Sequence, residues 1–308
     1  MIPLDHFLAL PTDEVAGLVK ATGQKVCVFP VNGTRRWFIL EHADKIGDDF
    51  LKAYMDESIK NHVQLCAMLF AHGIDTILAP VFGRELMRRG DEYTKRVGMD
   101  GLVRTATDKI YLDFFAQYNV KVRFYGDYRD VITGTPYEYA LKSMYDVTEA
   151  TKHNSSVRLF FGVFADESVE TAARLSVEYY LAQGAIPDKQ TLIRKYYGED
   201  LPPVSMFIGF DKFSAFDMPL LSTGEEDLYF SVSPSPYMTE RQLRTILYDH
   251  IYLRRVPEPD YTKLSPNDLD WLRNYYRNNK DYVLGVGKLK FDLWLPQTTE
   301  ENHDGSDH

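Results

Sequence analysis

A short arginine-containing loop carries the strongest chemical signal in the sequence. Residues 31–38 read VNGTRRWF and follow an apolar run. Gly33 permits a tight turn, and Arg35 and Arg36 add two planar, permanently charged groups that bind oxygen atoms bidentately. The pattern therefore predicts a diphosphate site. A motif this short also matches by chance, and the alternative is a surface arginine pair that forms salt bridges with the acidic helix that follows.

Aromatic residues form the second signal, with 21 Tyr, 18 Phe and 3 Trp in 308 residues. Most of them must fill the core. A substrate that ionises to a carbocation, however, needs a water-poor pocket with ring faces nearby, because a cation over a ring gains about 0.5–2 kcal/mol. Tyr54 and Tyr93 lie close to loops at the carboxyl edge of the predicted sheet and are candidates for this role. The alternative is that they are amphipathic edge residues.

Patterns for most other chemistries are missing. The sequence contains no Walker A loop, no HExxH zinc motif and no GxSxG nucleophile elbow. His62 and His72 lack the clustered spacing of metal ligands and are interpreted as structural. Cys27 and Cys66 lie in apolar stretches and are predicted to be buried free thiols of a reducing compartment.

The elements that must position these residues alternate between strands and helices. Continuous apolar runs predict buried strands over 25–30, 75–82, 120–127, 157–164, 206–210 and 228–232. Apolar residues at steps of three and four predict helices over 48–72, 104–118, 135–151, 166–183, 239–253 and 265–278. The alternation favours an α/β fold, with a six-stranded, mainly parallel sheet flanked by helices. Ligands of such a sheet bind at the carboxyl ends of its strands, where the arginine loop lies.

Composition bounds the class of protein. Lys and Arg total 35 against 45 Asp and Glu, a net charge of −10. A duplex-binding protein needs a positive surface, so we expect no nucleic-acid partner. The N-terminus resembles no signal peptide and no apolar run approaches the roughly 20 residues of a membrane span, so we expect a cytoplasmic protein without stable membrane insertion. We predict a single domain over 1–296 and a polar, disordered tail over 297–308.

Four segments, in order along the chain, resemble the cis-prenyltransferases (undecaprenyl diphosphate synthase-like enzymes). NGTRRW after the first strand resembles their D-G-N-x-R-W diphosphate loop, and HGIDTILAPVF (72–82), NVKVRFYGD (119–127) and EDLYF (226–230) resemble later family segments. The resemblance implies one cis-prenyltransferase-like domain that forms a homodimer. It also implies an isoprenoid diphosphate as the small-molecule substrate and Mg²⁺ as the cofactor.

Longer stretches resemble one branch of that family, the tuberculosinyl adenosine transferase and isotuberculosinol or kolavelool synthase group. These stretches are FPVNGTRRWF (29–38), YYGE (196–199), MFIGFDKFSAFDMPLLSTGEEDLYF (206–230) and PYMTERQLRTILYDHIYLRR (236–255). Members of the group ionise a bicyclic C20 diphosphate of the halimane or clerodane type instead of extending a chain. Chain-extending relatives hold isopentenyl diphosphate on an arginine-rich segment; residues 209–214 replace it here without an arginine. We expect no other basic cluster near the sheet edge.

The resemblance also implies roles for individual residues. The implied catalytic residues are Asn32, Tyr54 and Tyr93, and the implied substrate-binding residues are Gly33, Thr34, Arg35, Arg36, Trp37 and Phe82. Asp227 occupies the place of a carboxylate that assists Mg²⁺ in chain-extending relatives, so Asn32 and Asp227 are the predicted metal ligands. The family has an aspartate where this chain has Asn32, and an amide brings no negative charge to a hard cation. This departure has three interpretations: the protein uses a different mechanism, it is a substituted form that holds substrate unreacted, or it is a non-catalytic relative.

Together these observations predict an enzyme, a class I-type terpene synthase. Mg²⁺ and the arginine pair neutralise the departing diphosphate, an allylic cation forms in an aromatic pocket, and water captures it. The product is a diterpene alcohol such as kolavelool or tuberculosinol. Two alternatives stay open. In one, a nucleoside such as adenosine attacks the same cation; in the other, the chain is a non-catalytic subunit that binds an active prenyltransferase.

Overall fold

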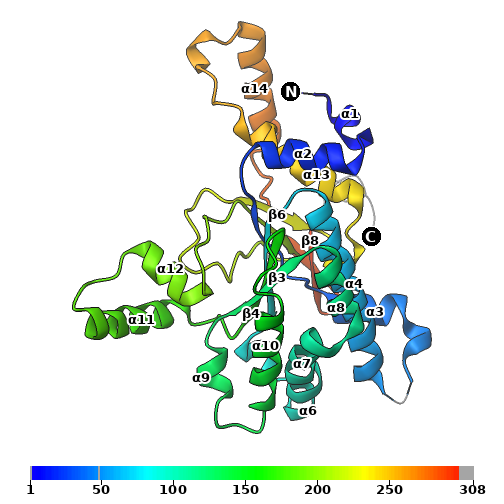
Figure 1. The fold of residues 1–308 in the computed structure, drawn as a ribbon. Coiled ribbons are helices and arrows are strands. Elements are labelled where there is room, and N and C mark those ends of the chain that lie inside the picture. The colour runs from blue at the N-terminus through cyan, green and yellow to red at the C-terminus, as the bar shows by residue number, and fades with distance from the viewer. Residues whose placement is uncertain (1, 48, 298–308) are drawn as a thin grey trace.

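The computed structural model describes residues 2–47 and 49–297 of the chain. Its centre is a sheet of six parallel strands in the order β3-β4-β2-β1-β5-β6 (Figure 1). The strands are β1 (Val26–Val28), β2 (Thr76–Phe82), β3 (Val120–Tyr125), β4 (Val157–Val163), β5 (Met206–Phe210) and β6 (Asp227–Ser231). The six predicted strands are confirmed, and the sheet is parallel throughout.

The apolar runs form strands because both faces of the sheet are covered. On β4, Leu159 and Phe161 belong to one hydrophobic cluster, whereas Phe160 between them belongs to the other. None of the three is more than 1% exposed. A strand that is buried on both sides has no polar face, so its sequence reads as a continuous apolar run.

Helices cover the two faces unequally (Figure 1). The larger cluster includes residues of α1 (Leu4–Ala9), α2 (Thr12–Ala21), α4 (Phe50–Ala71), α6 (Asp91–Tyr93), η2 (Thr94–Met99), α7 (Asp100–Thr107), α8 (Lys109–Gln117), α9 (Tyr128–Ile132), α10 (Tyr139–Ala150) and α13 (Glu240–Ile251). The smaller cluster is closed by α12 (Lys189–Tyr197) and the segment 201–221. The sequence analysis did not predict α1, α2 or α12.

The helix predicted over 104–118 is two helices, α7 and α8. Asp108 separates them with an extended conformation, φ −78° and ψ 125°. Its side chain accepts a hydrogen bond from the backbone N–H of Ile110 at 3.0 Å. An N-cap residue must leave the helical conformation, so the chain turns at this aspartate although the apolar periodicity continues.

The helix predicted over 166–183 is confirmed as α11 (Ser168–Gln183), which ends at Gly184 with φ 68°. Leu175 packs against the smaller hydrophobic cluster, but other apolar residues of α11 point away from it. Val169, Val177 and Leu181 are 81%, 59% and 78% exposed. In Figure 1, α11 projects from the side of the sheet beyond α12. Nothing within the described chain covers this apolar face.

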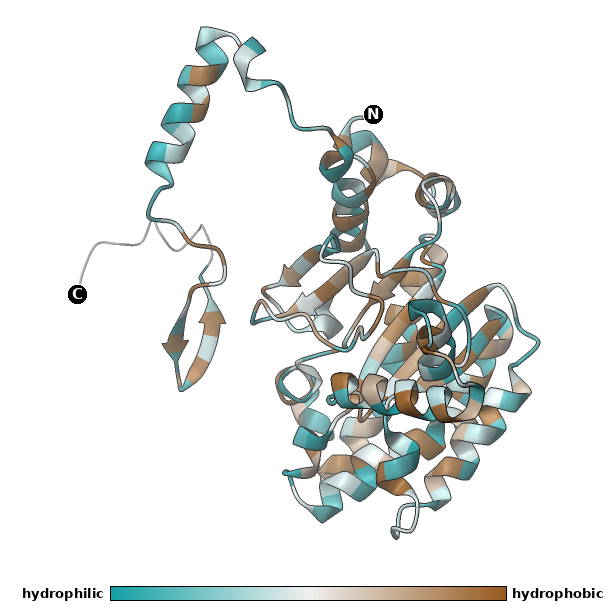
Figure 2. Cartoon of the chain, turned by 90° about the vertical axis from the view of Figure 1, so that its left-hand side faces the viewer, coloured by the Kyte–Doolittle hydropathy of each residue, from teal (hydrophilic) through white to brown (hydrophobic). Residues whose placement is uncertain are grey.

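A C-terminal arm follows α13. It consists of α14 (Pro266–Asn278), which was predicted, and an antiparallel hairpin of β7 (Gly287–Lys290) and β8 (Leu293–Pro296), which was not. Figure 2 shows both apart from the sheet and its helices. The domain boundary at residue 296 stays a prediction, and most of the predicted tail, 298–308, lies outside the described residues. No described helix is long and apolar enough to cross a bilayer.

Candidate active site at the carboxyl edge of the sheet

A cavity of about 1420 Å³ opens at the carboxyl edge of the sheet. Residues at the ends of β1, β2 and β4 and in the loop after β5 line it, which is where a parallel sheet binds ligands. Eight of the ten predicted site residues are in its walls: Asn32, Gly33, Thr34, Arg35, Arg36, Tyr54, Phe82 and Tyr93. The fold therefore brings most of the predicted site together from four separate stretches of the chain.

The predicted diphosphate loop is in part a helix, α3 (Thr34–Glu41). Gly33 precedes it with φ 76°, and a Cβ at this position would lie 2.8 Å from both Phe210 and Pro234, so only glycine fits. No side chain caps the first turn of α3. Uncapped N–H groups and the positive end of the helix dipole thus border the cavity, an arrangement that suits an anion.

Arg35 and Arg36 extend from that first turn. The Arg35 guanidinium lies 5.7 Å from the ring centroid of Phe50, and the Arg36 guanidinium lies 5.2 Å from that of Phe210. Arg36 Nη2 is 3.5 Å from Asp211 Oδ2, in the loop after β5. Among the described residues neither arginine forms an ion pair with a carboxylate of α4, so salt bridges to the following helix do not explain the arginine pair. Ring contacts hold both guanidinium groups at the cavity mouth.

Both predicted tyrosines are buried in the cavity wall. Tyr54 Oη lies 2.7 Å from Thr34 Oγ1, and burial raises the pKa of Tyr54 to about 12. Arg89 Nη1 donates a hydrogen bond to Tyr93 Oη at 3.0 Å. A phenol that stays protonated at neutral pH can donate a hydrogen bond but is a poor proton acceptor. Tyr54 is therefore placed to orient Thr34 or a diphosphate oxygen.

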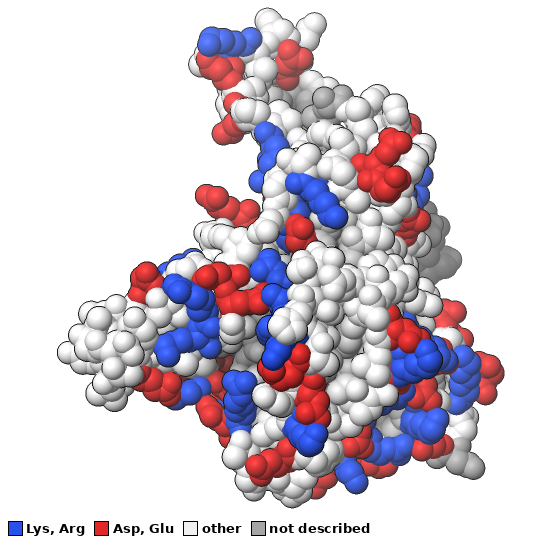
Figure 3. Space-filling view, in the orientation of Figure 1, with Lys and Arg blue, Asp and Glu red and all other residues white. Residues whose placement is uncertain are grey.

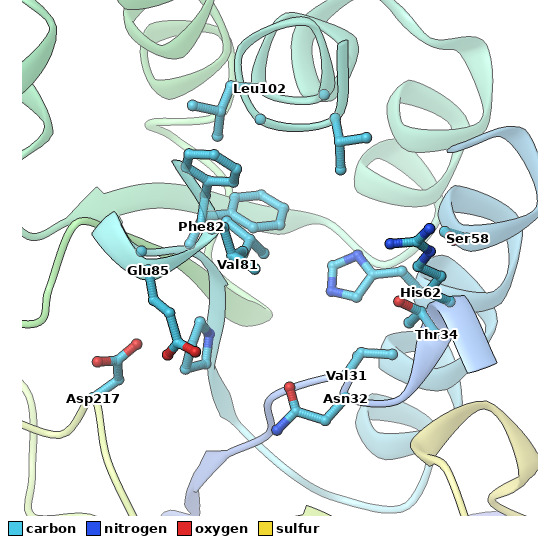
Figure 4. A pocket seen from close by; sticks show the side chains of 18 of the residues that line it. Val31, Asn32, Thr34, Ser58, His62, Val81, Phe82, Glu85, Leu102 and Asp217 are labelled. Atoms are coloured by element: carbon cyan, nitrogen blue, oxygen red, sulfur yellow. The ribbon is translucent and has the colours of Figure 1, made fainter. Parts of the chain in front are cut away.

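The deeper part of the cavity is apolar. Phe82, Leu102 and Phe161 line it and are at most 5% exposed. Figure 4 shows Phe82 and Leu102 across the cavity from His62. Burial lowers the pKa of His62 to about 4, and its Nδ1 lies 2.9 Å from Tyr111 Oη, so this imidazole is neutral at physiological pH. An interior of ring faces and a neutral imidazole suits a hydrocarbon cation, which an imidazolium would repel.

Two predicted site residues lie outside the cavity. The Trp37 ring packs edge-on against His42, with 4.8 Å between the ring centroids. Asp227 is the first residue of β6, at the amino edge of the sheet, opposite the cavity. Its Oδ2 lies 2.6 Å from His250 Nδ1 and accepts a hydrogen bond from Arg255 Nη2 at 2.7 Å. Asp227 is thus a buried ion-pair partner away from the cavity, and its metal-ligand role stays a prediction.

Comparison with known proteins agrees with this geometry. The chain is 43% identical to tuberculosinyl adenosine transferase of Mycobacterium tuberculosis (strain CDC 1551 / Oshkosh) over 294 residues, which are 95% of this chain and 97% of that protein. The chain belongs to the tuberculosinyl adenosine transferase branch of the cis-prenyltransferases. It is also 23% identical to a (+)-kolavelool synthase of Herpetosiphon aurantiacus over 301 residues, 96% of each protein. The branch that the motifs predicted is confirmed.

Solved structures of cis-prenyltransferases share the fold of this branch member. Lavandulyl diphosphate synthase from Lavandula x intermedia, in complex with dimethylallyl diphosphate, matches with a TM-score of 0.59 at 14% identity, over 80% of this chain and 99% of that one. A probable undecaprenyl diphosphate synthase from Campylobacter jejuni matches with a TM-score of 0.52 at 16% identity, over 76% and 97%. No protein-family model matches the chain.

A second group of arginines, not among the predicted site residues, lies at the cavity of this transferase-branch chain. Arg84, Arg88 and Arg89 follow β2, on and beside α5 (Arg84–Met87), and line the cavity. This corrects the expectation that no other basic cluster lies near the sheet edge. The sequence GRELMRRG, directly after an apolar run, indicates such a cluster. Arg84 Nη2 pairs with Glu167 Oε2 at 3.1 Å. Arg88 and Arg89 are exposed and add positive charge to the mouth.

The donor set at the mouth fits an anion. Asn32 offers a neutral amide, and among residues 2–47 and 49–297 no group of three or more His, Cys, Asp or Glu could hold a metal. Mg²⁺ prefers charged oxygen ligands. The Mg²⁺ site predicted for Asn32 and Asp227 stays a prediction.

Proposed function

We propose that this protein ionises a bicyclic C20 prenyl diphosphate and transfers the prenyl group to a nucleoside such as adenosine. The observation that carries the proposal is the division of one cavity into a basic mouth at α3 and an aromatic interior. The mouth suits a diphosphate, and the interior suits the hydrocarbon cation that remains. The 43% identity to tuberculosinyl adenosine transferase supports a nucleoside as the acceptor, in place of the water expected from the sequence.

The proposed reaction begins when the allylic C–O bond breaks and both electrons leave with the diphosphate. Arg35, Arg36 and the N–H groups of α3 stabilise this charge, and one such donor typically contributes a factor of about 10²–10³ to the rate. The cation stays against the rings of Phe82 and Phe161, where a ring contact contributes about 0.5–2 kcal/mol. A nitrogen lone pair of the nucleoside then forms the new C–N bond.

Mg²⁺ enters the proposal only as an ion that the diphosphate carries with it. Such an ion would neutralise charge on the diphosphate oxygens. Because the described chain offers no carboxylate cage at the mouth, no proposed step depends on a metal ligand from the protein. The arginines and α3 carry the charge stabilisation.

Water capture is a second candidate, supported by the similarity to (+)-kolavelool synthase. To separate the candidates, purified protein is supplied with geranylgeranyl, copalyl-, halimane- or clerodane-type diphosphate, and released diphosphate is measured with and without adenosine. We expect release from a bicyclic substrate, faster with adenosine. The same rate of diphosphate release with and without adenosine would favour the synthase. No release of diphosphate from any substrate would favour the non-catalytic subunit.

We also expect that the protein does not extend prenyl chains. Residues 209–214 contain no arginine, and Arg84 is already paired with Glu167. The segment that corresponds to the isopentenyl diphosphate site of chain-extending relatives therefore offers no bidentate clamp to a second diphosphate. The measurement is incorporation of radiolabelled isopentenyl diphosphate in the presence of a C20 allylic diphosphate. Label in a product of C25 or longer would contradict this expectation.

We propose in addition that the protein is a homodimer and that α11 is part of its interface. The exposed apolar residues of α11 are Val169, Val177, Tyr180 and Leu181. Figure 3 shows that the outer end of this projection carries few charged side chains. An exposed apolar patch of this kind is typical of a protein–protein contact, and the resemblance to a usually dimeric family supports a second copy as the partner.

Leu181→Lys is expected to shift the protein from dimer to monomer, because it places a charge in the apolar contact. Light scattering coupled to size exclusion should give twice 35.6 kDa for the native chain and one times that mass for the variant. Gln183→Lys, an exposed position on the same helix, is the matched control and should remain dimeric. A dimeric Leu181→Lys variant would show that the interface lies elsewhere. A monomeric native chain would contradict the proposed homodimer.

A further inference from the structure

The cavity has a second polar wall whose charge is opposite to that of the mouth. Glu85, Asp166 and Asp217 line it, together with Phe216 and Ser214 from the loop between β5 and β6. Figure 4 shows Asp217 and Glu85 on one side of the cavity, across from Asn32 and Thr34. One cavity thus combines an anion-binding end with an end that repels anions.

Two of these carboxylates are free to bind a ligand. Asp166 is occupied, because its Oδ2 accepts a hydrogen bond from the backbone N–H of Arg84 at 2.8 Å. The carboxylates of Asp217 and Glu85, in contrast, have no hydrogen-bond or ion-pair partner among the described residues. Asp217 is anchored through its backbone, where Tyr125 Oη donates to its carbonyl oxygen at 3.2 Å. Its carboxylate is therefore held in place without being neutralised.

A buried hydroxyl beside this wall also lacks a partner. Tyr196 is 8% exposed, and its Oη has no hydrogen-bond partner within the described chain. The ring centroids of Tyr196 and Tyr125 are 6.1 Å apart, and Tyr125 is the residue that anchors the backbone of Asp217. A buried polar group left unpaired costs free energy unless something satisfies it. Tyr196 does not line the cavity itself, so the unused donor lies behind the wall, near Asp217.

The chemistry of the wall selects its ligand. Two carboxylates accept hydrogen bonds from N–H and O–H groups and exclude a second diphosphate. Phe216, with its edge against Phe207 at 5.5 Å between ring centroids, offers a ring on which a planar base can stack. An uncharged purine nucleoside has the matching groups: an exocyclic amine, ribose hydroxyls and a flat π surface.

We propose that Asp217, Glu85 and Phe216 form the acceptor subsite, which binds a neutral purine nucleoside next to the prenyl cation; the inference rests on the proposed function. The nucleoside nitrogen donates its lone pair to the cation, the C–N bond forms, and the positive charge passes to the purine. The carboxylates face that charge as it develops. They therefore favour attack by a nitrogen base over a second anionic substrate.

The test is a steady-state measurement of the KM for adenosine at a saturating C20 diphosphate, with prenyl nucleoside and diterpene alcohol separated by liquid chromatography and mass spectrometry. Asp217→Asn and Phe216→Ala are each expected to raise the KM for adenosine at least about tenfold and to increase the share of alcohol. Asp281→Asn removes the same charge at an exposed position in the C-terminal arm and should leave both quantities unchanged. Melting temperatures check that each variant is folded.

Inosine supplies a readout that a merely structural role would not change. It replaces the exocyclic amine with a carbonyl oxygen, which the carboxylate of Asp217 repels and the amide of an asparagine can accept as a hydrogen-bond partner. The preference for adenosine over inosine should therefore shrink in Asp217→Asn. Prenyl adenosine formation with an unchanged KM and preference in the variants would overturn the subsite alone. No prenyl adenosine from the native chain would overturn the proposed function as well.

Discussion

Replacing Arg36 with alanine is expected to lower turnover of a C20 prenyl diphosphate by about 10²–10³-fold while the fold stays intact. Arg36 extends from the first turn of α3 into the cavity mouth, and its nearest carboxylate is Asp211 at 3.5 Å. At 3.5 Å that contact is too long to contribute much to the folding free energy. The lower turnover should therefore come from slower ionisation, because the developing charge of the departing diphosphate would lack a bidentate donor.

Arg277→Ala is the matched control for this variant, because Arg277 is exposed on α14, far from the cavity mouth in the fold. Turnover is measured as released diphosphate, and thermal melting reports the fold. Native turnover in Arg36→Ala with an unchanged melting temperature would move the diphosphate site away from α3.

Replacing Asn32 with aspartate is expected to raise the ionisation rate at least about tenfold at saturating Mg²⁺ and to make the reaction more dependent on Mg²⁺. The described chain lacks a carboxylate cage at the mouth, and Asn32 lies there with a neutral amide. A carboxylate adds a full negative charge beside a hard cation, whereas an amide offers only a dipole. Changes around metal sites commonly alter affinity or activity by roughly 10–100-fold.

The measurement is turnover of one C20 diphosphate by both forms across a Mg²⁺ titration, with calorimetry of Mg²⁺ binding in the presence of inorganic diphosphate as a second readout. Asn278→Asp, on the exposed face of the C-terminal arm, controls for the added charge. Lower activity of Asn32→Asp at every Mg²⁺ concentration would show that the amide contacts the diphosphate directly and that an added charge repels it.

The strands of the sheet could be predicted from the sequence because their burial is two-sided. Residues such as Phe160 and Phe161 face opposite layers of the core, so the run shows no polar interruption. The first turn of α3 was harder to predict. TRRW carries two charges and no apolar periodicity, so its sequence does not indicate a helix. The helix begins directly after Gly33, which adopts a left-handed conformation, and its arginines border the cavity.

The parts of the site that depend on strand order could not be predicted. Asp227 resembles a metal-assisting carboxylate by its place in the sequence, but it begins β6 and therefore lies at the opposite edge of the sheet from the cavity. Glu85 and Asp217 are distant in sequence and line one cavity only because the loops after β2 and β5 open on it. Hydrophobic periodicity describes one helix or strand at a time and does not predict which loops lie at the same cavity.

The periodicity of α11 was predicted correctly, but what covers its apolar face was not. Apolar residues at steps of three and four indicate that one side of a helix is buried, without saying what buries it. In this chain Val169 and Leu181 are largely exposed, so no surface of the described chain covers them.

The central claim is that one cavity ionises a C20 prenyl diphosphate and passes the prenyl group to a nucleoside. The most direct test is mass spectrometry of the products formed by purified protein from a bicyclic C20 diphosphate and ¹⁵N-labelled adenosine. We predict a product that contains the prenyl group and the intact labelled nucleoside, formed in step with released diphosphate. Release of diphosphate with only a diterpene alcohol and unchanged adenosine would contradict the account.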